Sequence, residues 1–202
     1  MTDDLDRIKE DMVACARRAY NCGLQTGNGG NLSCRAKGRD LVIIKASGYS
    51  FGECGEDNLI TVDMDGTKVD GDGSPSRELK THLAIYRSRP DIFGIFHCHS
   101  PWAIAYAEFD SEIPCLALHA AAKIGTIPVL NISGHADQNV VDAVTQLLAQ
   151  EKTTKAFVQS RHGIFGLGPS IVSAEHTAEL VEETAQIAWL ISMRQQLQAN
   201  VK

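Results

Sequence analysis

The sequence predicts an α/β fold in which short apolar strands and amphipathic helices alternate along a single domain. The chain has 202 residues, long enough for one well-buried core and short for two. Hydrophobic residues make up 44% of it and charged residues 22%, which is typical of a globular protein. Strand-like and helix-like segments interleave without a repeat, low-complexity tract or linker. We therefore expect one domain over residues 1–202.

Helices are expected where apolar residues recur on one helical face. These segments are residues 3–22, 76–89, 101–108, 137–150 and 174–197. Strands are expected at short apolar or alternating runs. These runs are residues 31–36, 40–45, 59–63, 67–69, 93–98, 127–132 and 156–159, with 164–167 as the continuation or the partner of the last. Asp65-Gly66 is a strong signal for a hairpin turn. The order of the strands in the sheet is left open.

The charge and the N-terminal segment argue against nucleic acid and membranes as partners. The formal net charge is −6, which is unfavourable for binding polyanions. The first residues, MTDDLDRIKEDM, lack the basic start and the apolar stretch of a secretory signal. No apolar run approaches the roughly 20 residues of a membrane helix. The six cysteines form no C-x-x-C pair and are expected to be reduced and mostly buried. These features predict a cytoplasmic protein.

Two histidines separated by one residue give the clearest chemical signal, in Phe96-His97-Cys98-His99-Ser100. Alternate residues of a strand face the same side, so His97 and His99 project together. Two adjacent imidazoles are suitable ligands for zinc or a similar ion. From this motif alone, a metal site and a pair of hydrogen-bonded surface histidines are about equally favoured.

Two more residues are candidates to complete a metal site. His162 precedes a glycine and follows an apolar strand, a position where α/β proteins often place functional groups. Glu78 is expected in the first turn of the helix at 76–89, where an acid also complements the helix dipole. From the sequence alone, the favoured role of Glu78 is to complement the helix dipole and not to bind a metal. His82 shares the helix face of Glu78 and is a rival ligand, although a packing or supporting role is favoured.

The other three histidines stand alone in the sequence. A surface position is favoured for His135 and His176. His119 lies between two expected strands and could line the site.

Three segments could bind a phosphate through backbone N–H groups. They are the glycine-rich turn at 26–31, the small-residue turn at 45–48, and the expected helix start at Ser76-Arg77. Turns and helix N-termini form concavities that accept anions, and Arg77 adds a planar guanidinium. Each signal is weak alone, so the segments support a phosphate site only if they converge in space.

Together these motifs resemble the class II aldolase/adducin family over about residues 8–195. In order they are G-G-N-L-S at 29–33, K-A-S-G at 45–48, P-S-R-E at 75–78, H-C-H-S at 97–100 and R-H-G at 161–163. The family includes sugar-phosphate aldolases, L-ribulose-5-phosphate 4-epimerases and decarboxylases of four-carbon sugar-acid phosphates. The resemblance implies a single-domain three-layer α/β/α sandwich and a homotetramer with sites between subunits.

The resemblance also implies residue roles. His97, His99 and His162 match the family's metal-binding histidines. Glu78 matches the acid that coordinates the ion and exchanges protons in the aldolases, which makes this role the favoured one. Asn31, Ser47, Gly48 and Ser76 match phosphate-binding positions, with Arg77 beside them. The implied cofactor is one Zn²⁺ per chain, with other divalent metals allowed.

The implied activity is that of an aldolase, which cleaves a ketose 1-phosphate into dihydroxyacetone phosphate and an aldehyde. Arg77 replaces the second serine of the aldolases' P-S-S-E and is similar to the decarboxylases, so a decarboxylase of a phosphorylated 3-oxo sugar acid is the alternative. Epimerases carry Asp at the position of Glu78 and a catalytic Asp where this chain has Ala121, which counts against 4-epimerisation. The aldolases' catalytic Tyr has no clear counterpart near His119. A non-catalytic adducin-like module is disfavoured because all four ligand positions are intact.

Overall fold

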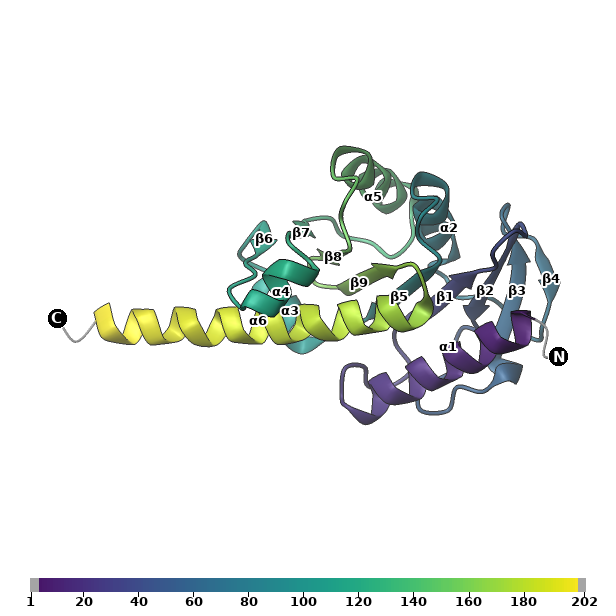
Figure 1. Cartoon of the computed structure of the whole chain (residues 1–202), viewed down its shortest axis with the longest axis horizontal. Coiled ribbons are helices and arrows are strands. Elements are labelled where there is room, and N and C mark those ends of the chain that lie inside the picture. The colour runs from purple at the N-terminus through teal and green to yellow at the C-terminus, as the bar shows by residue number, and fades with distance from the viewer. Residues whose placement is uncertain (1–3, 200–202) are drawn as a thin grey trace.

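The computed structural model describes residues 4–199 as a nine-stranded sheet with helices on both faces (Figure 1). The helices are α1 (Asp4–Asn21), α2 (Leu79–Ser88), α3 (Pro101–Tyr106), α4 (Leu118–Lys123), α5 (Gln138–Gln150) and α6 (Ile171–Ala199), with a 3₁₀ turn at Glu56–Asn58. The strands are β1 (Asn31–Arg35), β2 (Leu41–Lys45), β3 (Leu59–Asp63), β4 (Lys68–Asp70), β5 (Gly94–Cys98), β6 (Glu112–Ile113), β7 (Ile127–Leu130), β8 (Ala156–Gln159) and β9 (Gly163–Gly168).

The strand order is β4-β3-β2-β1-β5-β9-β8-β7-β6. Adjacent strands are antiparallel except for β7 and β8, which are parallel. In Figure 1, α1 and α6 lie below the sheet and α2 and α5 above it. The expected three-layer α/β/α sandwich is therefore confirmed.

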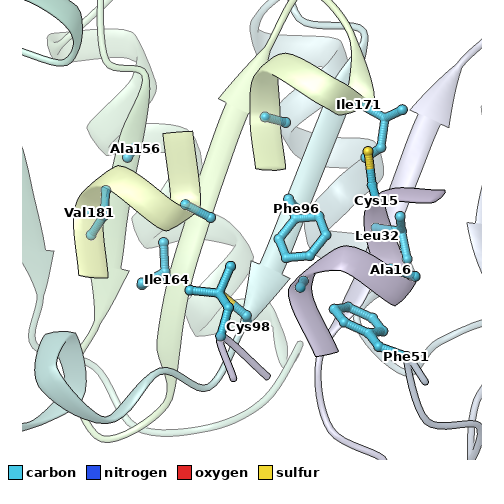
Figure 2. Close-up of a cluster of buried hydrophobic side chains, with 14 of the residues drawn as sticks. Cys15, Ala16, Leu32, Phe51, Phe96, Cys98, Ala156, Ile164, Ile171 and Val181 are labelled. Carbon is cyan, nitrogen blue, oxygen red and sulfur yellow. The ribbon is translucent and has the colours of Figure 1, made fainter. Parts of the chain in front are cut away.

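Each face of the sheet carries its own apolar core because the strands alternate. Figure 2 shows the core that the sheet shares with α1 and α6. Its labelled residues are Cys15, Ala16, Leu32, Phe51, Phe96, Cys98, Ala156, Ile164, Ile171 and Val181. The opposite core lies under α2 and α5 and includes Tyr86, Val144, Ile95 and Phe165. β5 thus buries Phe96 towards α6, and its neighbour His97 faces the other side and stacks on Phe165.

Glycines in the central strands allow α6 to lie directly against the sheet. A Cβ at Gly166 of β9 would lie 2.3 Å from the carbonyl oxygen of Ala174, and one at Gly94 of β5 would lie 2.4 Å from that of Ser170. Both contacts are with backbone atoms, which cannot rotate away. The close packing of α6 therefore requires the absence of side chains at these positions.

The substitution Gly166→Ala is expected to lower the free energy of unfolding by about 1–3 kcal/mol, the usual cost of overpacking a tight interior. Urea denaturation followed by circular dichroism measures this change. Gly55→Ala is the matched control, since Gly55 has extended backbone angles and its Cβ would meet no atom closer than Asn58 Oδ1 at 3.8 Å. Equal midpoints for the two variants would contradict the packing argument.

Most predicted elements are present, with shifted ends. The helix expected at 76–89 begins at Leu79, so Glu78 precedes it as the N-cap residue, with φ −90° and ψ 9°. The segment expected at 164–167 is an antiparallel partner of β8, not its continuation. The short elements β6 and α4 were not predicted. Residue 3 of the first expected helix lies outside the described residues.

All six cysteines are free thiols, and four of them are buried, as expected for a reduced protein. Within residues 4–199, no helix combines the length and the apolar character that a membrane span requires.

Candidate metal centre

The four predicted metal-binding side chains meet at one point, although three different parts of the fold supply them. Glu78 precedes α2, His97 and His99 lie at the end of β5, and His162 lies in the turn between β8 and β9. The Glu78 carboxylate joins two of the rings, with Oε2 3.1 Å from His97 Nε2 and Oε1 3.0 Å from His162 Nε2. His97 Nε2 is 3.1 Å from His99 Nε2. These separations are close to the roughly 3.3 Å between ligand atoms in a tetrahedral zinc site.

The turn before β9 is shaped to bring His162 against β5. Arg161, the residue before it, adopts a positive φ of 58° and pairs with Glu108. A Cβ at Gly163 would lie 2.2 Å from the carbonyl oxygen of Cys98, so a glycine is needed for this approach. The sequence Arg161-His162-Gly163 therefore sets the position of the third imidazole.

Hydrogen bonds fix the orientation of two of the rings. His97 Nδ1 lies 2.9 Å from the carbonyl oxygen of Ile164, which can only accept, so Nδ1 carries the proton and the Nε2 lone pair faces the centre. His162 Nδ1 lies 2.9 Å from Gln159 Oε1. The Gln159 amide nitrogen donates to the carbonyl oxygens of Ile132 and Gly134, which leaves Oε1 as the acceptor. His162 therefore also presents Nε2 as a lone pair.

The protonation states suit a divalent ion. Burial lowers the pKa of His97 to about 3, and burial also lowers the pKa of His99. Burial alone would raise the pKa of the Glu78 carboxyl, but His97, His162 and the Asn31 amide outweigh burial and hold this pKa well below its usual range. Neutral imidazoles and an ionised carboxylate are the forms that bind metals. The three nitrogens and one carboxylate therefore fit a zinc-like ion.

The predicted phosphate-binding segments converge on a cavity of about 460 Å³ beside this cluster. Residues 26–31, Ser47, Gly48, Ser76 and Arg77 line it, together with Glu78, His99 and His162. The second and third segments are joined by backbone hydrogen bonds, from Ser47 N to Ser74 O at 2.9 Å and from Ser76 N to Lys45 O at 3.2 Å. The three segments therefore meet in space, which is the condition that a shared phosphate site requires.

Asn31 lies within the cluster and not at its edge. It is buried, and its Nδ2 donates to Glu78 Oε2 at 2.7 Å. The Asn31 amide therefore holds the Glu78 carboxylate in place in this structure.

Gln25 and Gln159 were not predicted from the sequence, Lys45 was named only as part of the turn at 45–48, and His135 was expected on the surface. Gln25 accepts a hydrogen bond from the backbone N–H of His99 at 2.7 Å. Gln159 orients His162. Lys45 lines the cavity, and burial lowers its pKa to about 8. His135, expected only on the surface, lines the cavity with its ring centroid 5.0 Å from that of His162. A lysine in an apolar strand was a usable signal; the glutamines gave none.

The other histidines lie away from the centre. His82 is fully buried and its Nδ1 lies 2.7 Å from Ser33 Oγ, in agreement with the favoured packing role. His119 does not line the cavity within the described residues; it lies in a separate groove along α6 with Trp102 and Lys123. The prediction that His119 could line the site is therefore wrong for the cavity beside the four metal-binding candidates.

Comparisons with known proteins agree on one family. The model described as "Class II Aldolase and Adducin N-terminal domain" matches residues 10–189. The L-ribulose-5-phosphate 4-epimerase UlaF of Salmonella paratyphi C is 34% identical over 195 residues, covering 92% of this chain and 86% of that protein. A solved L-fuculose 1-phosphate aldolase is 25% identical with a TM-score of 0.85, covering 95% of this chain and 88% of that one. YgbL of Escherichia coli is 26% identical with a TM-score of 0.84, covering 92% and 89%.

Proposed function

Because the chain belongs to the class II aldolase and adducin family, we propose that it is a metal-dependent lyase that cleaves a C–C bond of a phosphorylated ketose. The products are dihydroxyacetone phosphate and an aldehyde. The observation that supports this best is the Glu78 carboxylate, which joins His97 and His162 beside a cavity also lined by the glycine-rich turn at 26–31 and the turn at 45–48.

Glu78, His97, His99 and His162 would hold one divalent ion, and zinc suits this set of ligands. When bound, the ion supplies Lewis-acid stabilisation of the negative charge that builds on substrate oxygen as the C–C bond breaks. The Asn31 amide and the backbone carbonyl of Ile164 keep Glu78 and His97 oriented towards that position.

Glu78 carries the proton in this proposal. It takes a proton from the substrate hydroxyl as the bond breaks and returns one to the product carbon. Its low pKa keeps it ionised at neutral pH, and it would accept the proton once the substrate displaces it from its ligand position.

The phosphate is anchored at Asn31, Ser47, Gly48 and Ser76, with Arg77 beside them. Ser47 and Arg77 are exposed at the cavity wall, where a hydroxyl and a guanidinium can reach an incoming phosphate. This places the phosphate end of the substrate near the start of α2.

Two alternatives share this centre. The identity to UlaF favours 4-epimerisation by cleavage and rejoining of a C–C bond. Two residues count against epimerisation. This chain has Glu78 where the epimerases carry Asp, and Ala121 of α4 where they carry a catalytic Asp. Arg77 favours the second alternative, decarboxylation of a phosphorylated 3-oxo sugar acid.

One set of incubations separates the three reactions. Metal-loaded protein is incubated with ketose 1-phosphates, L-ribulose 5-phosphate and phosphorylated 3-oxo sugar acids, each with and without chelator. Chelator-sensitive release of an aldehyde with dihydroxyacetone phosphate supports the lyase. Formation of the C4 epimer, or release of carbon dioxide, would instead identify one of the alternatives.

The proposed setting is a cytoplasmic homotetramer with sites between subunits. The exposed apolar side chains of Phe109, Leu116 and Leu118 are the candidates for a contact between subunits. Light scattering of the purified protein measures the oligomeric state.

Gln159→Leu is expected to lower metal affinity about 10- to 100-fold, the usual effect of removing a residue that orients a ligand. The change frees His162 Nδ1 and leaves two carbonyl oxygens without their donor. Competition with a metal indicator measures the affinity. Gln146→Leu, on the exposed face of α5, is the control and should bind metal like the unmodified protein. Unchanged affinity in Gln159→Leu would show that His162 needs no such support.

A further inference from the structure

His135 is the imidazole beside His99 and His162 at the cavity that neither the proposed ligand set nor the proposed phosphate site uses. It lies on the connection between β7 and α5, and its ring stands perpendicular to that of His162. A ligand atom of His135 lies within 4.8 Å of ligand atoms of both Glu78 and His162. The ring is exposed, and no hydrogen bond engages it within the described residues. A donor and an acceptor nitrogen are therefore available at the cavity surface.

The connection that carries His135 is held in place by the same residue that orients His162. Gln159 Nε2 donates to the carbonyl oxygens of Ile132 and Gly134 at 3.2 and 2.7 Å, while its Oε1 binds His162. Gly134 has a φ of 121°, and a Cβ there would lie 2.3 Å from Asp137 Oδ2. Asp137 in turn caps α5 by accepting from Val140 N at 3.1 Å. The backbone on both sides of His135 is thus held in place, while its ring stays free to meet a ligand.

We propose that His135 contacts the substrate directly, by a hydrogen bond to an oxygen of the part that lies beyond the phosphate. This inference rests on the proposed function, because it takes the phosphate to be bound near the start of α2. A substrate whose phosphate is bound near the start of α2 and whose other end reaches Glu78 would come within hydrogen-bonding reach of His135. His135 would also be a second polar group, besides Glu78, at the end of the substrate that reacts. The sequence shows no clear counterpart there of the aldolases' catalytic tyrosine.

The geometry favours substrate over metal as the partner of His135. His97, His99 and His162 form one compact set of metal-ligand atoms, and His135 groups with Glu78 and His162 but not with His97 and His99. An ion held by the three histidines leaves His135 to one side, facing the cavity, whereas Glu78 still reaches that set through its Oε2, 3.1 Å from His97 Nε2.

The test measures binding and not turnover. Metal-loaded protein and its His135→Ala variant are titrated by calorimetry with dihydroxyacetone phosphate and, separately, with inorganic phosphate. We expect the variant to bind dihydroxyacetone phosphate about 3- to 10-fold more weakly, since one hydrogen bond to a polar ligand is lost. Binding of inorganic phosphate and the metal content should not change. His135→Asn should recover part of the affinity, and His176→Ala, which removes an exposed histidine of α6, should have no effect.

Several results would overturn the proposal. These are unchanged affinity of His135→Ala for dihydroxyacetone phosphate, an equal loss for inorganic phosphate, loss of the metal, or an unmodified protein that binds both probes equally. Failure of the proposed function looks different. A protein that binds dihydroxyacetone phosphate through His135 but cleaves no ketose 1-phosphate would refute the lyase and leave the role of His135 standing.

Discussion

Replacement of His97 by alanine is expected to remove the divalent ion and to lower turnover by about 10³-fold or more, because the Lewis-acid contribution of the ion is lost. His97 is fully buried, and its Nε2 is 3.1 Å from both Glu78 Oε2 and His99 Nε2. Phe165 stacks on one face of the His97 ring, so the ring is held in place by packing as well as by its hydrogen bond. Replacement of His99 should have the same outcome.

Elemental analysis of the purified variant and a steady-state assay measure the two effects of His97→Ala. Because the change also removes a buried ring, a matched control is needed. His82→Gln alters another fully buried histidine, four residues after Glu78, that faces Ser33 and not the centre. This control should keep its metal. Full activity of a metal-free variant lacking both His97 and His99 would end the proposal.

Glu78→Gln is expected to keep the metal and to lose about 10²- to 10⁴-fold in rate, the usual contribution of a positioned acid–base group. The three imidazoles still converge, so ion binding survives with lower affinity. The amide cannot accept and return a proton, although its size is nearly that of the carboxylate. Single-turnover rates with metal-saturated enzyme measure the loss.

Glu183→Gln is the control for Glu78→Gln, since it removes an exposed carboxylate of α6 and should leave the rate unchanged. Turnover of Glu78→Gln at the level of the unmodified protein would remove Glu78 from the chemistry. Loss of metal in step with loss of rate would show instead that Glu78 acts as a ligand alone.

Local patterns in the sequence were sufficient for the α/β class of the fold and for the histidine pair, and the three-layer sandwich came from the resemblance to the family. Period-two alternation in β5 placed His97 and His99 on one side. His162 and Glu78 were candidates from their positions, and the resemblance to the family made the ligand role of Glu78 the favoured one. Strand order could not be predicted, because β1 and β9 flank β5 through contacts between segments distant in the chain.

The supporting residues of the site depended on that strand order. Gln25 precedes a glycine turn and Gln159 ends a strand. Nothing in the sequence around either residue indicates that its side-chain amide contacts a histidine. His135 is exposed, as predicted. Its place at the cavity could not be predicted, because the segments that form the cavity meet only in the folded chain.

The dispersion of the four proposed metal-binding side chains over three separate segments would couple ion binding to folding. In an unfolded chain Glu78, His97 and His162 are far apart, so an ion would bind the native state almost exclusively. Such an ion tethers the start of α2, the end of β5 and the β8–β9 turn to one another. At a thousandfold excess over its dissociation constant, it would raise the free energy of unfolding by about 4 kcal/mol. Chelation would therefore weaken the whole sheet, including regions far from the cavity, and the melting temperature would report how much of the protein is loaded.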